Sequence, residues 1–236
     1  PAREGSAWVG GEGDCGSTGN ETYPVTSPVP HRVALPVAID SITAGGYHAC
    51  GLTSDGTAYC WGYNVLGQLG NGNNVTTATP VAVAGGLRFA TLRAGLYVTC
   101  GTTVGDGRGY CWGSDDYTAL GSSTPPETCQ IETFVHQCAT RPVPVDGPAS
   151  FRMIVPGEIY GCGVSTAGPT WCWGLNSFGV LGTGNTNNSP APVAIGTWAF
   201  VDLDAFQLHT CGITDESDMF CWGKNDFGRL GDGTTV

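Results

Sequence analysis

The chain has 236 residues, of which 41% are hydrophobic and 12% charged, and it contains 38 glycines and 15 prolines. Twenty acidic against nine basic residues give a net charge of -11, so a nucleic-acid partner is not expected. The apolar runs are too short to span a bilayer, so insertion into a membrane is not expected either. The many small, β-branched and aromatic residues predict an all-β fold with enough apolar side chains for a core.

Residues 1–27 are predicted to form a degenerate partial repeat or cap. Within them, residues 7–11 read Ala-Trp-Val-Gly-Gly and resemble a degenerate copy of a Trp-Gly element that recurs later. Cys15 is the odd one of eleven cysteines, because the other ten fall into five pairs. Two interpretations of Cys15 stay open, a buried or capped thiol and an intermolecular disulfide.

Residues 28–236 are predicted to form tandem repeats of about fifty residues. The tripeptide Cys-Trp-Gly occurs four times, and another cysteine lies ten or eleven residues before each copy. Strand-like repeats of this length are typical of propeller blades, in which each small sheet buries its faces against its neighbours. We therefore predict a β-propeller of about four blades. The four copies begin at Cys60, Cys111, Cys172 and Cys221.

Each repeat is predicted to begin with a strand that carries two inward-pointing apolar anchors. They lie eleven and eight residues before the first cysteine of the repeat. The first anchors are Ile39, Phe89, Phe151 and Phe200, and the second are Ile42, Leu92, Ile154 and Leu203.

The paired cysteines are predicted to clip β-hairpins. Asp55-Gly56 lies midway between Cys50 and Cys60, and Asp-Gly supplies the positive φ that tight hairpins need. Directly opposed residues on antiparallel strands lie close together, so a disulfide is expected there, although sequence alone does not prove connectivity. Zinc is disfavoured, because zinc ligands are usually closer together in sequence. The predicted pairs are Cys50 with Cys60, Cys100 with Cys111, Cys162 with Cys172, Cys211 with Cys221 and, in an insertion at 122–140, Cys129 with Cys138.

The segment after each Trp-Gly step carries a family resemblance. It reads Asn-Val-Leu-Gly-Gln-Leu-Gly from Asn64, and similar stretches start at Asn176 and Asn225. With the Gly-x-x-His and Asp-Gly elements, these residues resemble the repeat of the regulator of chromosome condensation superfamily over about residues 28–236. The resemblance implies a β-propeller, usually of seven blades. The second copy departs from the pattern, because Thr118 replaces the middle glycine and the insertion follows it.

The number of copies leaves the architecture of the complete molecule open. The array could be an unusual small ring, an incomplete piece of a longer propeller, or an open array whose ends are completed by another chain. An exposed terminal strand must be covered or used, so self-assembly is one hypothesis.

No catalytic, cofactor or metal site is predicted. His48 and His209 occupy equivalent positions of two repeats and are interpreted as hydrogen-bonded core residues, whereas His31 and His136 are expected in loops. The carboxylates at Asp115-Asp116 and in residues 215–218 are interpreted as solvated turns rather than a calcium site, because no calcium-loop pattern surrounds them. Candidate sites of covalent glycans are the sequon residues Asn20, Asn74 and Asn187.

Function is predicted from these features together. Paired cysteines favour an oxidising compartment, and a chain that begins at Pro1 fits removal of a leader, so a secreted, extracellular protein is expected. The superfamily's nucleotide exchange on a small nuclear GTPase is not expected of this acidic, cysteine-rich chain. We predict a non-catalytic propeller that contacts proteins, as a binding module or as a self-assembling surface or filament subunit. The alternative is a polysaccharide- or peptidoglycan-active enzyme, which would need clustered carboxylates or histidines.

Overall fold

The computed structural model describes residues 7–11, 27–124, 126–196, 198 and 200–235. Within these ranges the chain forms eighteen strands and two short 3-10 helices, which confirms the predicted all-β class. No helix in these ranges is long and apolar enough to cross a membrane.

The strands form four antiparallel sheets, which we call blades 1 to 4, and one N-terminal hairpin. Within each blade, strands that follow one another in the sequence pair side by side, apart from the inserted strand β10. The hairpin is β1 (Trp8–Gly11) with β2 (Ser27–Arg32). Blade 1 is β3 (Ser41–Ala44), β4 (His48–Leu52), β5 (Ala58–Gly62) and β6 (Thr77–Ala82). Blade 2 is β7 (Phe89–Ala94), β8 (Val98–Thr103), β9 (Gly109–Ser114), β10 (Glu127–Ile131) and β11 (Phe134–Pro144). Blade 3 is β12 (Phe151–Pro156), β13 (Tyr160–Ser165), β14 (Thr170–Gly174) and β15 (Ser189–Ile195), and blade 4 is β16 (Phe200–Phe206), β17 (His209–Thr214) and β18 (Met219–Gly223).

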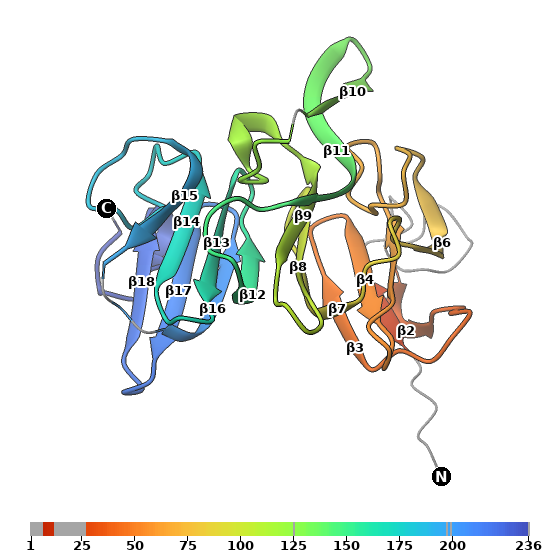
Figure 1. Cartoon of the computed structure of the whole chain (residues 1–236), viewed down its shortest axis with the longest axis horizontal. Coiled ribbons are helices and arrows are strands. Elements are labelled where there is room, and N and C mark those ends of the chain that lie inside the picture. The colour runs from red at the N-terminus through yellow and green to blue at the C-terminus, as the bar shows by residue number, and fades with distance from the viewer. Residues whose placement is uncertain (1–6, 12–26, 125, 197, 199, 236) are drawn as a thin grey trace.

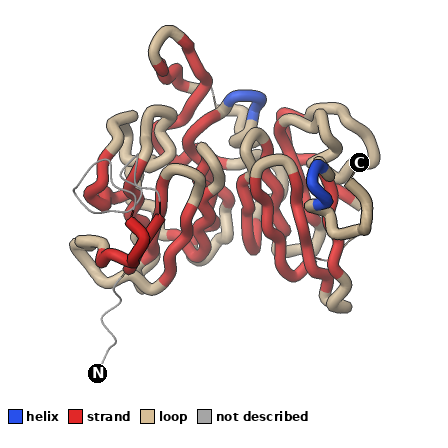
Figure 2. The backbone as a smooth tube through the Cα atoms, turned by 180° about the vertical axis from the view of Figure 1, so that it is seen from behind, coloured by secondary structure: helices blue, strands red, loops and turns tan. Residues whose placement is uncertain are grey.

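The blades follow one another across the molecule, from blade 1 at the right of Figure 1 to blade 4 at the left. The first strands of all four blades contribute to one central hollow, which is lined by Thr43, Arg93, Val155 and Asp204 among others. Figure 2, seen from behind, shows loops gathered at both ends of the strands. This four-blade propeller arrangement confirms the predicted fold.

The hairpins have the predicted register. Each first cysteine lies opposite its partner, as in Cys50 with Cys60, and the Cα atoms of these four pairs are 4.0 or 4.1 Å apart. Gly56 has the positive φ of +80° that the Asp-Gly turn requires. A fifth disulfide joins Cys129 and Cys138 in the insertion. All five predicted pairs are therefore disulfides in the structure.

Neighbouring blades are joined by one repeated apolar interface. Phe89, Leu92 and Trp112 of blade 2 share a buried cluster with the Cys50–Cys60 disulfide and Leu69 of blade 1. The indole Nε1 of Trp112 donates to the carbonyl of Gln68 at 2.9 Å. The same bond recurs from Trp173 to Ala119 and from Trp222 to Val180, at 2.9 and 2.8 Å. The contacts between blades, rather than any single blade, therefore stabilise the array.

Gly70 permits this close approach of the tryptophan. Its φ is +66°, and a Cβ added there would lie 2.6 Å from the Nε1 of Trp112. A side chain would be strained by the backbone conformation and would also collide with the indole. The Leu-Gly step that ends the motif thus serves the interface between blades in blades 1 to 3, where Gly121 and Gly182 lie similarly close to Trp173 and Trp222.

The prediction of an inward-pointing apolar anchor is wrong for one residue, Ile42. Ile42 is 49% exposed, whereas its equivalents Leu92, Ile154 and Leu203 are buried against the preceding blade. Among the described residues only the two-stranded β1–β2 hairpin precedes blade 1, and Ile42 lines a shallow pocket with Ala7 and Ile39 rather than packing against a full blade. The indole of Trp61 on the same blade is buried with Ala7 and Val33 of the N-terminal segment.

The predicted division into a cap at 1–27 and a propeller at 28–236 stays a prediction. Strand β2 begins at Ser27 and so spans the proposed boundary. Cys15 and Asn20 lie outside the described residues, so what the sequence predicts for them stays a prediction as well.

Candidate protein-binding face

Four equivalent loops build one end of the propeller, which we call the upper face because it lies uppermost in Figure 1. Each loop follows the third strand of a blade and is organised by one buried side chain. In blade 1 this is Asn64, whose Oδ1 accepts the N–H of Leu69 at 2.9 Å while its Nδ2 donates to the carbonyls of Asn73 and Val75. A buried amide with both ends satisfied fixes the loop and the residues at its tip. Asn176 and Asn225 occupy the same place in blades 3 and 4.

Blade 2 uses Asp115 at this position. Its Oδ1 accepts the N–H of Leu120 at 3.1 Å. Burial raises the pKa of the Asp115 carboxyl, and this hydrogen bond offsets part of that effect. The structure thus gives Asp115 a structural role in the loop rather than the solvated position expected from the sequence.

A large apolar side chain stands two residues after each of these loop anchors. Leu66 of blade 1 is only 4% exposed, because the inserted hairpin covers it. The other three positions hold exposed aromatic residues, and Phe227 is 92% exposed. Aromatic side chains of this kind are enriched among residues that dominate protein interfaces. The three are Tyr117, Phe178 and Phe227.

Three tyrosines form a second aromatic group on the same face. The rings of Tyr47 and Tyr97 stack with centroids 5.4 Å apart, and the ring of Tyr63 lies 5.9 Å from that of Tyr47. Partial burial raises the pKa of Tyr97 to about 12, with smaller contributions from Tyr47, Tyr63 and Glu158. Tyr97 therefore stays neutral, and the three tyrosines together present both ring surface and hydroxyl groups.

The inserted hairpin of β10 and β11 projects above the upper face in Figure 1. Its base is fixed, because Cys129 and Cys138 form a disulfide and pack with Leu66 and Tyr97. Its tip carries Phe134 and Val135, which are 68% and 67% exposed. A rigid hairpin with an apolar tip suits contact with another protein.

Asp116 and His136 hold this hairpin against blade 2. The Nδ1 of His136 and the Oδ2 of Asp116 are 2.7 Å apart, and the other carboxylate oxygen accepts the backbone N–H of Gln137 at 3.1 Å. Both oxygens of Asp116 are therefore engaged in positioning the hairpin. The sequence predicted His136 and His31 in loops, but they lie in strands β11 and β2.

The remaining candidate residues are two histidines at equivalent positions and the acidic segment 215–218. His48 is buried, and its Nε2 lies 2.7 Å from the Oγ1 of Thr99 on blade 2, as expected of a core histidine. His209 is half-buried at the equivalent position of blade 4. Residues 215–218 form the exposed turn between β17 and β18. Among the described residues no group of three or more His, Cys, Asp or Glu side chains is placed to hold a metal ion.

Asn74 and Asn187 are exposed in the loops that lead into the fourth strands of blades 1 and 3. Their glycosylation stays a prediction. The aromatic residues of the upper face were missed by sequence reasoning. Aligning the repeats on Asn64, Asp115, Asn176 and Asn225 would have placed Tyr117, Phe178 and Phe227 at one position, whereas the grouping of the three tyrosines needed the fold.

Comparison with known proteins identifies the family. Two models of the regulator of chromosome condensation (RCC1) repeat together match residues 39–103 and 167–229, which is more than half of the chain. This chain belongs to the RCC1 repeat family. It is 27% identical to the ultraviolet-B receptor UVR8 of Arabidopsis thaliana over 185 residues. This match covers 77% of the present chain and 40% of UVR8.

Two solved structures share the fold of the chain. The chain matches human WBSCR16 with a TM-score of 0.84 at 22% identity, over 99% of this chain and 60% of that one. It matches yeast RCC1 (Prp20), solved bound to Kap60, with a TM-score of 0.75 at 19% identity, over 97% of this chain and 56% of that one. The chain therefore spans between two fifths and three fifths of the length of these matched proteins.

Proposed function

We propose that this chain is an extracellular, non-catalytic RCC1-repeat propeller that binds a protein partner through its upper face. The observation that carries the proposal is the occurrence of exposed aromatic and apolar side chains on the hairpin and on three of the four loops of that face. They run from the hairpin tip at Phe134 and Val135 to Tyr117, Phe178 and Phe227. Disulfide and buried-amide anchors hold these side chains in place before binding, which lowers the entropic cost of association.

Three further observations support parts of this proposal. Five disulfides fit an oxidising compartment outside the cell. The carboxylate and imidazole groups that gather on the upper face, Asp116 and His136, bond to each other and to backbone rather than pointing into a cleft. The related yeast propeller RCC1 (Prp20) was solved bound to another protein, Kap60.

The test replaces the hairpin tip, with Phe134→Ser and Val135→Ser together. The matched control is Val104→Ser, an exposed apolar residue near the turn between the second and third strands of blade 2, at the opposite end of the propeller. Proteins retained from extracellular fluid by the unchanged chain are identified, and binding of the purified partner is then measured. We expect the tip variant to bind at least about tenfold more weakly and the control to bind normally. Equal binding by both variants would remove the upper face from the proposal.

Self-assembly is a second candidate, because exposed apolar residues occur at both ends of the row of blades, at Ile42 and Met219. Measuring the mass of the purified chain with and without reductant separates the candidates. A monomer in both conditions would refute assembly, and a polymer would refute the simple binding module. The enzyme alternative predicts that Asp116→Ala with His136→Ala abolishes turnover of a defined glycan.

A further inference from the structure

Three tyrosines of the upper face, Tyr47, Tyr63 and Tyr97, are not required by the repeat, and we call them the tyrosine cluster. The carbonyl of Tyr47 accepts the N–H of Tyr63 at 2.9 Å, and an equivalent backbone bond occurs in each of the other blades. In blades 3 and 4 the carbonyl of this bond belongs to Ile159 and Leu208. The fold therefore needs the backbone at this position but not the tyrosine side chain.

Close packing of two turns holds the tyrosine cluster in place. Tyr47 and Tyr97 lie in the turns between the first and second strands of blades 1 and 2, and the N–H of Gly46 joins these turns by donating to the carbonyl of Gly95 at 3.0 Å. The two stacked rings are nearly parallel, with an interplanar angle of 19°, and the base of the inserted hairpin packs against Tyr97. Tyr47 remains 41% exposed, so a flat aromatic surface is held ready for a ligand.

The carboxylate of Glu158 lies beside this surface. Glu158 belongs to the equivalent turn of blade 3, which abuts the turn of blade 2, because a Cβ added at Gly95 would lie 2.8 Å from the carbonyl oxygen of Pro156. Burial is the main cause of the raised pKa of Tyr97, and the charge of Glu158 adds to it, so the carboxylate is near that ring. Glu158 is half-buried, and among the residues that the structure describes no hydrogen bond or ion pair engages its carboxylate. A half-buried carboxylate of this kind is stabilised by an incoming cation.

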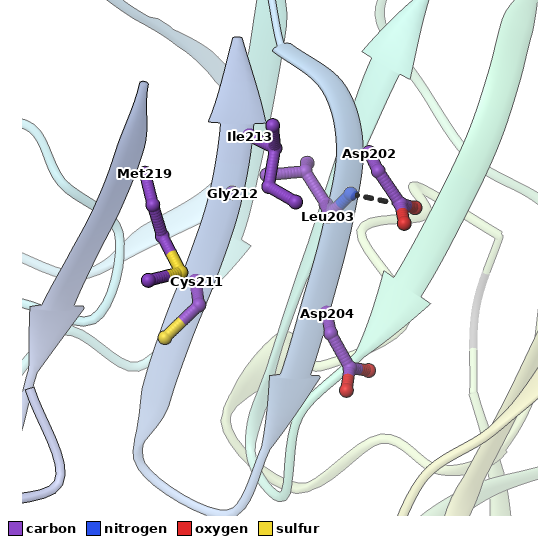
Figure 3. Close-up of a pocket in the computed structure, with 7 residues that line it drawn as sticks. All are labelled: Asp202, Leu203, Asp204, Cys211, Gly212, Ile213 and Met219. Carbon is purple, nitrogen blue, oxygen red and sulfur yellow. Dashed lines mark hydrogen bonds between the residues drawn. The ribbon is translucent and has the colours of Figure 1, made fainter. Parts of the chain in front are cut away.

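The other charges nearby also favour a cation at this place. The whole chain carries a net charge of -11. Arg93 and Asp204 both line the central hollow that these turns border, and their opposite charges offset each other. Figure 3 shows the carboxylate of Asp204 projecting from β16. Glu158 therefore leaves an excess negative charge here, and no Lys or Arg side chain in the described part of the chain lies over the ring of Tyr47 or Tyr97.

We infer that the tyrosine cluster and Glu158 form a binding site for an arginine side chain of the partner protein, whose guanidinium stacks on the tyrosine rings and pairs with the carboxylate. A planar guanidinium extends a flat stack of rings and forms two parallel hydrogen bonds with a carboxylate. The compact ammonium group of lysine matches a flat, open ring surface less well. The site rests on the proposed function, because it specifies the chemistry of the partner that the upper face binds.

The experiment titrates the chain with N-acetyl-arginine methylamide and follows the tyrosine ring signals by nuclear magnetic resonance. The matched control compound is N-acetyl-citrulline methylamide, which has nearly the same shape but no charge, and the lysine compound is the second control. We expect the arginine compound to shift the ring signals of Tyr47 and Tyr97 saturably at millimolar concentrations. The citrulline compound is expected to bind at least about tenfold more weakly, and the lysine compound also more weakly than arginine.

Two chain variants locate the site. Glu158→Gln removes the charge and keeps the shape, and Tyr47→Leu places at this position the residue type that blade 4 has there. Each is expected to weaken binding of the arginine compound at least about fivefold. Glu216→Gln makes the same chemical change as Glu158→Gln in the exposed turn between β17 and β18, and it is expected to leave the affinity unchanged. Thermal unfolding checks that all three variants are folded.

Equal binding of the arginine and citrulline compounds, or unchanged affinity in both Glu158→Gln and Tyr47→Leu, would overturn the inference. Equal binding of the lysine compound would overturn the choice of arginine. The titration needs no partner protein, so it can fail separately from the proposed function. If the hairpin-tip variant loses the purified partner while Glu158→Gln and Tyr47→Leu keep it, the proposed function stands and the arginine site is refuted.

Discussion

Blades 3 and 4 carry the same disulfide-clipped hairpin but place it in different surroundings. In blade 3 the Cys162–Cys172 disulfide is fully buried, because Phe200 and Leu203 of blade 4 share its apolar cluster. In blade 4 Cys211 and Cys221 are half-exposed, because no described blade covers that face. The repeat therefore sets which residues face the next blade, and the neighbour decides whether they are buried.

The largest difference between the two blades is expected for their tryptophans. Trp173→Ala removes a fully buried indole and leaves the Ala119 carbonyl without its donor, so we expect a loss of about 3–5 kcal/mol in the free energy of unfolding. Trp222 is partly exposed at the equivalent position, and Trp222→Ala is expected to cost clearly less. Urea unfolding of both variants measures the two losses. Equal losses would show that the extent to which the indole is buried does not control the energy.

Equivalent histidines should differ in their response to acid. Burial lowers the pKa of His48 to about 4, from 6.5, so the folded chain keeps this ring neutral while the unfolded chain protonates it. Stability is then fully present above pH 6.5 and falls by up to about 3 kcal/mol as the pH drops toward 4. Partial burial and Arg229 also lower the pKa of His209, but this ring is half-exposed and a smaller effect is expected.

Valine substitutions test this difference, because Val98 occupies the same position in blade 2. The free energy of unfolding is measured at neutral pH and near pH 4.5. His48→Val should lose much of the acid sensitivity, whereas His209→Val should keep it. An acid response that survives in His48→Val would assign the sensitivity to other groups.

Burial of a disulfide by the next blade should also control how readily that disulfide is reduced. Each ten- or eleven-residue clip stabilises the chain by roughly 2–3 kcal/mol. A thiolate must reach the sulfur to break it, so the half-exposed Cys211–Cys221 bond is expected to be reduced before the three buried equivalents. Limited reduction, alkylation and peptide mass analysis give the order. Reduction of the Cys50–Cys60 disulfide before the Cys211–Cys221 disulfide would contradict this expectation.

The smallest effect concerns a departure of blade 2 from the repeat. Thr118 has a positive φ of 61° at the position where blades 1, 3 and 4 have glycine. A β-branched residue is strained in this conformation, so Thr118→Gly is expected to raise the free energy of unfolding by about 1 kcal/mol. Thermal or urea unfolding measures the gain, and Ser123→Gly in the exposed loop nearby provides the control. A destabilised Thr118→Gly would mean that the threonine is not strained.

The sequence by itself determined the repeat and the hairpins, and it predicted the disulfide pairs that the structure shows. These features are local, since a hairpin's register follows from its turn, and cysteines on either side of Asp55-Gly56 must face each other. The anchor positions were also local, and the prediction failed only where a neighbour was lacking, at Ile42.

Only the tertiary structure decided how the blades present their surfaces. Tyr47 and Tyr97 are fifty residues apart and stack because two blades lie side by side. His136 reaches Asp116 because the inserted hairpin folds back over blade 2. Such long-range neighbours depend on which blades and loops lie side by side in space, so they cannot be read from a local pattern of residues.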